Sequence, residues 1–550
     1  MNMNRKHTAI YLALASAALL GSIQAQASGT NTGYPIDITT GSYNTGLGVD
    51  TLVSVTGQQN VGLGWGALNK LTSGDFNIGI GSGALNNITT SSHNIGIGRA
   101  ALGNSSTGDN NVAIGSFSLV STTGSNNTAS GYYSLSANTT GRDNTASGYY
   151  SLSANTTGGS NTASGRYSLY SNTIGSDNTA SGGGSLFSNT EGDRNTATGV
   201  LSLYSNTEGN DNTASGWASL YSNTEGDHNT ASGWTSLYSN TEGNDNAAVG
   251  NSAMYGNISG SSNAAMGAFA LSTNTTGNFN NAMGVNALFA NTTGENNSAQ
   301  GVAALFNNTT GNNNVAVGTF SLQANTTGNF NLGIGLASGY SNTSGSSNIF
   351  LGYLAGASET GSNKLYIASN GTRPLLYGEM SETAADNKLG IGTNVVGVGK
   401  TIAVHNGASL SAGGVWTNAS SRELKDDIEA LSAEDANAAL EALSPVRYVY
   451  KNSREEQYVG FIAEEVPELV ATNDHKSLSP MDIVAVLTTV AKDQKGEITV
   501  LRDALAQEKL TNQKQQSTIE KQEERMLQME IALAEVLRNQ STEMQVGSAN

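Results

Sequence analysis

A pentapeptide frame, Asn-x-x-x-Gly, returns at a fixed interval through more than half of this 550-residue chain. A fixed short period is typical of a solenoid, in which each repeat buries its apolar face only against its neighbours. We therefore expect a stacked fibre whose function lies in an extended surface. The closing glycines, seventeen residues apart from Gly131 onward, are Gly48, Gly64, Gly81, Gly98, Gly115, Gly131, Gly148, Gly165, Gly182, Gly199, Gly216, Gly233, Gly250, Gly267, Gly284, Gly301, Gly318, Gly335 and Gly352.

The composition limits what this region can fold into. Charged residues make up 12% of the chain, against roughly 25% in ordinary globular proteins, and glycine occurs 67 times. Such a chain cannot build a conventional Leu/Ile/Phe core across its middle. Disorder is the alternative, but the strict period and the regularly placed Leu and Ala residues argue against it.

The unit at residues 148–164 shows what one coil contains. Two short extended runs are separated by Asn and Gly, which tolerate turn conformations, so we expect two short strands in each coil. The fourth residue after the glycine is nearly always Leu, and the middle of the second run is usually Ala. At about 4.8 Å per coil, the stack would be on the order of 90 Å long around a thin core.

Aromatic residues recur at two positions of the unit, and burial between chains could supplement the thin core there. Stacked rings could form a glycan-binding platform or a seam between subunits, and the seam is the simpler interpretation. The rings just after the glycine are Tyr149, Tyr150, Tyr167, Trp217, Trp234, Phe269 and Phe320, and those after the Leu position are Tyr170, Phe187, Tyr204, Tyr221, Tyr238, Tyr255, Phe289 and Phe306.

The strings Asn-Val-Ala-Ile-Gly at 111–115 and Asn-Val-Ala-Val-Gly at 314–318 carry a resemblance. They resemble the head repeats of trimeric autotransporter adhesins, and the similarity covers residues 44–355. The resemblance implies a mainly β fold, a left-handed parallel β-roll solenoid that assembles as a homotrimer. The handedness follows from the resemblance alone.

After residue 355 the period fails and three shorter regions follow. Short alternating runs at 363–367, 375–378 and 389–392 predict a small β-rich neck over 356–416, a segment that resembles those preceding the terminal domain of many phage tail fibres. Residues 417–495 have the composition of a globular α+β domain, with a helix capped at Ser432, strands at 446–451 and 458–463, and a helix starting at Ser479-Pro480. Residues 541–550 form a tail.

Residues 496–540 carry a heptad pattern without a helix breaker, which predicts a C-terminal coiled coil rather than a single amphipathic surface helix. The pattern is apolar at both ends and polar in the middle, where a buried Asn512 could fix the register. The two core positions are Ile498, Leu505, Asn512, Ile519, Met526 and Leu533, and Leu501, Glu508, Gln515, Gln522, Met529 and Val536.

Three motifs in the globular domain carry a second resemblance: Ser-Ser-Arg-Glu-Leu-Lys-Asp-Asp-Ile at 420–428, Leu-Ser-Pro-Val at 443–446 and Gly-Phe-Ile-Ala-Glu-Glu-Val-Pro at 460–467. They resemble the intramolecular chaperone domain of phage endosialidases and tailspikes. The resemblance implies a domain that trimerises, assists folding of the fibre and cuts itself off with Ser420 as nucleophile and Lys425 as general base. Ser421 and Glu423 replace the Asp and Arg usual in that family. An uncleaved domain, with Ser420 only capping a helix, is the alternative.

The first residues predict export. A basic start, an apolar run from Ala9 to Leu20 and an Ala-Gln-Ala site indicate a signal peptide over 1–27, followed by a lead-in over 28–43. We expect a secreted or cell-surface protein without an integral membrane segment in the mature chain. With no cysteines, stability has to come from the stack or from oligomerisation.

Several classes of partner and function are disfavoured. The net charge of −18 argues against nucleic acid, and five scattered histidines give no metal-ligand spacing, so neither metal nor cofactor is expected. An enzyme, if any, would be a single-turnover Ser-Lys autoprotease. A phage-type polysaccharide depolymerase would want regularly placed paired carboxylates, which the repeats lack.

The predicted function is an exported trimeric fibre, structural or adhesive, that contacts itself and a surface glycan or protein ligand. Alternatives are a phage-type glycan-binding tail fibre and an ice-binding solenoid. The ice-binding alternative rests on outward hydroxyl pairs at Thr128/Ser130, Thr145/Ser147, Thr162/Ser164, Thr179/Ser181, Thr196/Thr198, Thr213/Ser215 and Thr230/Ser232.

Overall fold

The computed structural model describes residues 43–546 apart from 54, 372 and 418. The chain divides into two compact units, of which the first ends at Ala419 and the second begins at Ser420. The expected signal peptide over 1–27 and nearly all of the lead-in over 28–43 lie outside the described residues.

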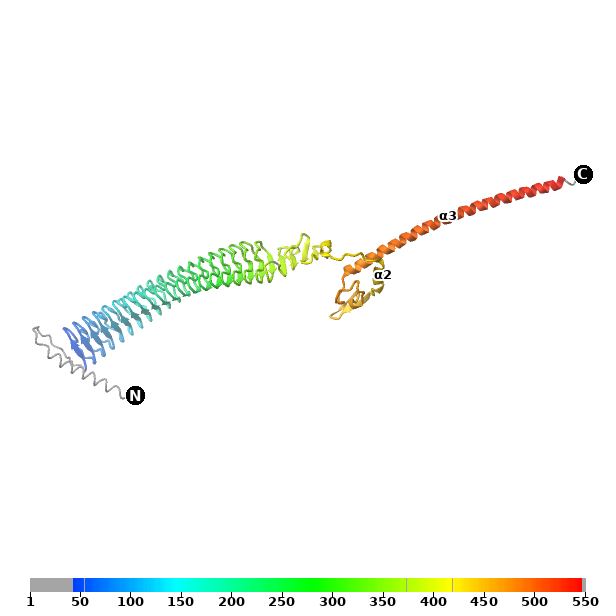
Figure 1. Cartoon of the computed structure of the whole chain (residues 1–550). Helices are drawn as coiled ribbons and strands as arrows, with labels where there is room; N and C mark the ends of the chain where they lie inside the picture. Colours follow the sequence, from blue (N-terminus) through cyan, green and yellow to red (C-terminus); the bar gives the residue numbers. More distant parts are fainter. Residues whose placement is uncertain (1–42, 54, 372, 418, 547–550) are drawn as a thin grey trace. The chain divides into compact units, whose positions relative to one another are not determined.

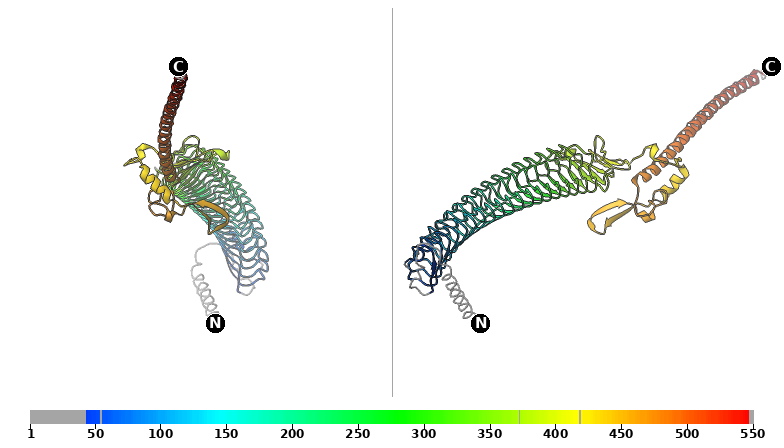
Figure 2. Two further views of the ribbon diagram at one scale, coloured as in Figure 1. Left: turned by 90° about the vertical axis from the view of Figure 1, so that its right-hand side faces the viewer. Right: turned by 60° about the vertical axis from the view of Figure 1, so that its left-hand side comes forward.

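The first unit is a parallel β-solenoid, as expected, whose coils stack along one gently bending axis (Figures 1 and 2). Each strand pairs in parallel with the next, residue for residue, as Thr145 with Thr162. The strands are β1 (Thr45–Leu47), β2 (Val61–Leu63), β3 (Ile78–Ile80), β4 (Ile95–Ile97), β5 (Val112–Ile114), β6 (Thr128–Ser130), β7 (Thr145–Ser147), β8 (Thr162–Ser164), β9 (Thr179–Ser181), β10 (Thr196–Thr198), β11 (Thr213–Ser215), β12 (Thr230–Ser232), β13 (Ala247–Val249), β14 (Ala264–Met266), β15 (Asn281–Met283), β16 (Ser298–Gln300), β17 (Val315–Val317), β18 (Leu332–Ile334) and β19 (Ile349–Leu351).

Each coil has one strand, so the expectation of two was wrong. The run that carries the leucine forms turns, and Leu152 adopts a left-handed conformation with φ of 52°. Its N–H donates to Ser168 O of the next coil at 2.9 Å, which holds the backbone there. A left-handed Leu costs about 1–2 kcal/mol, and complete burial of its side chain returns about 1.5–3 kcal/mol. The Leu position therefore tolerates a conformation that local preference disfavours.

The expected Leu and Ala columns are fully buried, but they share the interior with two columns of buried asparagine. The strand-side asparagine column precedes each strand, and the turn-side asparagine column follows the leucine by three residues. In one coil, Asn144 and Asn155 both donate to Gly158 O at 2.9 Å. Asn155 also donates to Asn138 Oδ1 of the preceding coil at 2.7 Å. The thin apolar core is thus supplemented inside the chain by hydrogen bonds between coils.

The interior changes at both ends of the solenoid. In the first coils the turn-side position holds the buried apolar residues Val55, Leu71 and Ile88 instead of Asn. In the last coils Gly339 and Gly356 replace the Leu, and the fully buried Phe350 replaces the Ala. A Cβ on either glycine would collide with the Phe350 ring, so the ring fills the space that two missing leucines leave.

The neck forms as expected at its three short runs and continues the solenoid sheet. β20 pairs in parallel with β19. β21 then pairs antiparallel with β20 and with β22, and β23 pairs in parallel with β22. β24 pairs antiparallel with β23 and with β25. Lys388 Nζ donates to Glu379 Oε2 at 2.7 Å in this sheet. The strands are β20 (Lys364–Ile367), β21 (Leu376–Glu379), β22 (Lys388–Ile391), β23 (Lys400–Val404), β24 (Ser409–Ser411) and β25 (Trp416–Thr417), with a short helix η1 (Ala384–Asp386).

The second unit is a small α+β domain that leads into a long helix. The cap expected at Ser432 is confirmed, since its Oγ accepts from the N–H of Asp435 at 3.0 Å. The first expected strand is confirmed as well, whereas the second begins earlier, at Ser453. The elements are η2 (Arg422–Leu424), α2 (Ala433–Ala442), β26 (Val446–Tyr450), β27 (Ser453–Gly460), η3 (Ala463–Glu465) and α3 (Pro480–Val546).

Helix α3 begins at Pro480, as the Ser479-Pro480 signal predicts. Its first turns pack on α2, and Val486 and Val490 lie in the core of the small domain. The residues from Gln494 to Ser541 are all exposed, including the apolar heptad positions. Within the described part of the chain, no helix has both the length and the apolar character needed to cross a membrane.

Candidate functional site

The structure brings together the two residues proposed as a catalytic pair. Lys425 Nζ donates a hydrogen bond to Ser420 Oγ at 2.9 Å. The short helix η2 makes this contact, because it turns the chain between the two residues and Lys425 N donates to Arg422 O at 3.2 Å. Ser421, rather than Ser420, caps this turn, and its Oγ accepts from Glu423 N at 3.3 Å. The Ser420 hydroxyl is thus left to face Lys425.

Both side chains of the pair are exposed in the single chain. A serine hydroxyl becomes a good nucleophile when a neighbouring base takes its proton. A lysine amine can act as that base only in its neutral form, which burial favours. The geometry of a Ser-Lys pair is therefore present, and the burial that would activate it would have to come from a further contact.

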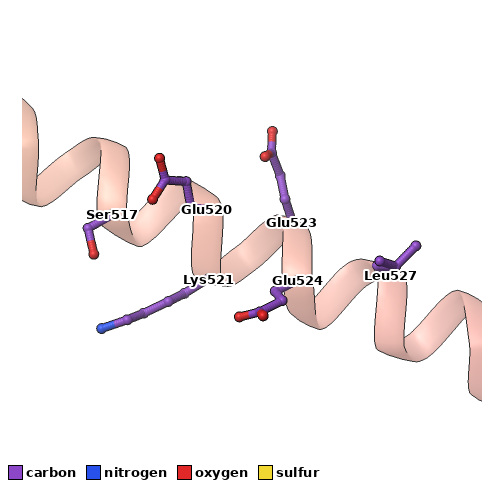
Figure 3. A pocket seen from close by; sticks show the side chains of 6 residues that line it. All are labelled: Ser517, Glu520, Lys521, Glu523, Glu524 and Leu527. Atoms are coloured by element: carbon purple, nitrogen blue, oxygen red, sulfur yellow. The ribbon is translucent and has the colours of Figure 1, made fainter.

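A hollow of about 440 Å³ in the neck is lined by residues that include Lys364, Glu379 and Lys388. No group of three or more His, Asp or Glu side chains among the described residues is arranged to hold a metal ion. A hollow along α3 is lined by residues of that one helix (Figure 3). Glu520 and Glu523 project to one side of the helix, and Ser517, Lys521 and Glu524 project to the other. This is open helix surface rather than a cleft.

The aromatic residues after the Leu position form a continuous stack within the chain. Six rings in consecutive coils, from Tyr170 to Tyr255, stand 4.9–5.1 Å apart with interplanar angles of 3–11°. Because each ring turns its face toward its neighbours, the edges are what the stack presents outward. These ring faces are in contact within the chain, whereas in the other aromatic row Trp217 and Trp234 are 44% and 54% exposed. A glycan platform or a subunit seam at the aromatic residues stays a prediction.

The outward hydroxyl pairs lie as the strand alternation predicts. In β7 and β8, Thr145 pairs with Thr162 and Ser147 with Ser164, and these side chains are exposed around the buried Ala. Two regular hydroxyl columns therefore run along β6 to β12. An ice-binding role for them stays a prediction.

The same exposed face of the sheet carries aliphatic residues outside the hydroxyl region, which sequence reasoning missed. In β5 the outward pair is Val112 and Ile114, and in β18 it is Leu332 and Ile334. The signal was available, because Ile-Gly-Ile and Val-Ala-Ile strings place two aliphatic residues on one face of a three-residue strand.

Comparison with known proteins identifies one part of the chain. Residues 420–474 match the protein family described as "Chaperone of endosialidase". This confirms the resemblance drawn from the three motifs, and the matched segment includes both Ser420 and Lys425. No curated protein and no solved structure matches this chain.

Proposed function

From the match of residues 420–474 to the endosialidase chaperone, we propose that this protein is an exported homotrimeric fibre with a C-terminal domain that drives assembly and then cuts itself off. The observation that carries the proposal is the junction of a long parallel solenoid with a chaperone-type segment in one chain. An assembly domain would bring the copies together before the coils form.

Helix α3 is the element that would hold three copies together. Its apolar heptad residues are exposed in a single chain, with Leu505, Ile519 and Leu533 about half exposed. In proteins most helical stability comes from packing of an amphipathic face, so a partner helix would stabilise the exposed heptad positions of α3. A parallel coiled coil over residues 496–540 would bury that seam, with Asn512 fixing the register.

The self-cleavage would occur at the bond between Ala419 and Ser420. The Ser420 hydroxyl attacks the carbonyl carbon of Ala419, its proton passes to the neutral amine of Lys425, and the C–N bond breaks as the nitrogen of Ser420 takes a proton. Water then hydrolyses the ester between the two parts. This bond lies at the boundary of the two compact units, so cleavage would separate them without dividing either one. Contact between copies would supply the burial that Lys425 requires.

Intact-mass measurement of the purified secreted protein tests export and cleavage together. We expect wild type to yield two products, residues 28–419 and residues 420–550. Ser420→Ala and Lys425→Met should yield one uncleaved chain that begins at Ser28. Ser453→Ala is the matched control, because Ser453 is an exposed serine of the same domain outside η2, and this variant should still be cut. An uncut wild-type chain would refute the cleavage step, and a product that keeps residues 1–27 would refute export.

The role of the assembled fibre is proposed to be structural or adhesive, with a surface glycan or protein as ligand. The regular exposed hydroxyl columns favour one other candidate, ice binding. Thermal hysteresis measured on the secreted fibre separates the two, since an adhesin should show none. Binding to arrays of purified glycans tests the glycan ligand and the tail-fibre alternative.

A further inference from the structure

Four tyrosines in consecutive coils form a column in which each ring faces the next. We define the tyrosine column as Tyr204, Tyr221, Tyr238 and Tyr255, each of which directly follows the buried Leu or Met of its coil. The centroids of successive rings are 5.1, 5.0 and 5.1 Å apart, and the ring planes are nearly parallel, at 3–10°. Phe187 continues the stack on one side, so the phenol groups are confined to these four coils.

The backbone holds neighbouring tyrosines of the column in register. The carbonyl of each tyrosine from Tyr221 onward accepts a hydrogen bond at 3.0 Å from the serine that follows the preceding tyrosine, as Tyr221 O does from Ser205 N. Successive tyrosines are therefore about 4.8 Å apart along the stack, the spacing of paired strands. They are nevertheless seventeen residues apart in the sequence, so each pair brackets one whole coil.

The rings of the column remain accessible at their edges. Tyr204, Tyr221 and Tyr238 are half-buried, and Tyr255 is 41% exposed. Within the described part of the chain, no protein group forms a hydrogen bond with any of the four phenol hydroxyls. Each hydroxyl can therefore exchange its proton with water.

We propose that the tyrosine column is a modification site, at which a haem peroxidase and hydrogen peroxide join tyrosines of neighbouring coils as dityrosine. The inference goes beyond the proposed function and depends neither on the homotrimer nor on self-cleavage. It assigns a role to phenol groups that neither of those steps uses.

The reaction balances without any further co-reactant. Each of two neighbouring phenols loses one electron and one proton, which leaves a tyrosyl radical with unpaired electron density on the carbon ortho to the oxygen. Two ortho carbons form a C–C bond, and the hydrogen on each of them moves to the oxygen of its own ring. The O–O bond of hydrogen peroxide breaks as it takes up the two electrons and two protons and becomes two waters. Each cross-link therefore costs the protein two hydrogen atoms.

Geometry, rather than exposure, selects the column for this reaction. Holding two reacting groups side by side makes their coupling effectively unimolecular. A radical in the column has a second phenol one coil away, and rotation of the two side chains brings the ring edges together. Tyr340 and Tyr353 are 42% and 51% exposed but make no ring contact in the described part of the chain. Either of them has to meet a tyrosine of another molecule.

A cross-link between coils would stabilise a chain that has no cysteine and hence no disulfide. Joining two residues seventeen apart closes a loop in the unfolded chain and reduces its conformational entropy, as a disulfide does. Because the column spans four coils, the links would tie together the middle of the shaft. Oxidation then makes this part of the fibre harder to unfold.

Peptide mapping of the oxidised full-length protein tests the proposal. The purified protein is treated with a plant haem peroxidase and hydrogen peroxide, denatured, and cut with a glutamate-specific protease. Glu208, Glu225 and Glu242 each lie between two successive tyrosines of the column, so every tyrosine of the column falls on its own peptide. A cross-link joins two of these peptides, with a mass lower by two hydrogen atoms than their sum. The peptide 296–359, which carries Tyr340 and Tyr353, is the internal reference.

The double variant Tyr221→Phe/Tyr238→Phe removes the two central phenols and keeps the stacked rings, as Phe187 does in the native chain. Tyr204 and Tyr255 are then three coils apart. We expect joined column peptides to fall at least about tenfold in this variant, because the neighbouring phenol supplies the high effective concentration. Tyr340→Phe is the matched control and should leave the column links unchanged.

The links should form within one chain, so a denaturing gel should show the oxidised column at the mass of a single chain. Oxidation should also lengthen the half-life of the wild-type shaft against a protease in denaturant by at least about tenfold, and not that of the double variant. Column peptides that stay separate, or that are joined no more often than peptide 296–359, would overturn the proposed site. Joined peptides with an unchanged half-life would overturn the stabilising role.

Discussion

The turn-side asparagine column offers a direct measure of how much the interior hydrogen bonds contribute, through the substitution Asn308→Ala. Asn308 is fully buried and donates to Asn291 Oδ1 at 2.8 Å and to Gly311 O at 2.9 Å. It also accepts from Asn325 Nδ2 at 2.8 Å. Gly311 O keeps a second donor, the Nδ2 of Asn297, at 2.8 Å. The substitution therefore leaves Asn291 Oδ1 unpaired, whereas Asn325 Nδ2 loses one acceptor and keeps Gly328 O at 3.0 Å.

An unpaired buried polar group costs about 1–3 kcal/mol, so Asn308→Ala should lower the free energy of unfolding of the surrounding coils by about 1–3 kcal/mol. Asn307→Ala is the control. The Asn307 side chain is exposed, so its removal should change the free energy of unfolding by less than about 0.5 kcal/mol. Hydrogen exchange of the amides in these coils, at fixed protein concentration, measures the free energy of local opening. Equal protection in the two variants would refute the view that the asparagine columns stabilise the stack.

Two further predictions concern the coil turn and the neck. Gly182→Ala should destabilise the solenoid by at least about 1–3 kcal/mol from its backbone alone, since φ is 140° and a Cβ would lie 2.5 Å from Gly199 O. Gly183→Ala should melt like wild type, because its Cβ would make only an ordinary contact of 3.9 Å with Arg166 O. In the neck, the hydrogen bond from Lys388 holds the pKa of Glu379 below its ordinary value of 4.5. The stability from this pair is complete above pH 4.5 and is lost as the pH falls through the lowered pKa. Calorimetry at pH 6 and pH 3 should show that stability depends less on pH in Lys388→Met than in wild type. An equal pH dependence in the two proteins would contradict the role given to this pair.

Much of the solenoid could be predicted from its period, because burial in a stack demands the same residue at the same place in each coil. The leucine and alanine columns followed from that rule. The turn conformation at Leu152 did not, since a left-handed leucine is disfavoured locally and is imposed by its bond to the next coil. The sequence also predicts turns at the asparagines, although their strict recurrence at two positions is a signal for an interior ladder.

The candidate cleavage pair could be named only through the resemblance of its motif. Composition and spacing alone do not bring Ser420 and Lys425 together, because two residues five apart meet only in particular turns. The turn of η2, capped by Ser421, supplies that geometry. The exposure of the Ser420 and Lys425 side chains in the single chain depends on the tertiary structure, and no sequence pattern could predict it.

The residue-for-residue pairing of the seventeen-residue coils has a consequence for how such a protein changes over generations. The coils from β6 to β12 are nearly interchangeable, and removing one of them would rejoin identical columns of Leu, Ala and Asn. Loss or duplication of one repeat within the coding sequence would thus shorten or lengthen the shaft by about 4.8 Å without a new fold. The length of the shaft can then change by one coil at a time over generations, while the first and last coils stay the same.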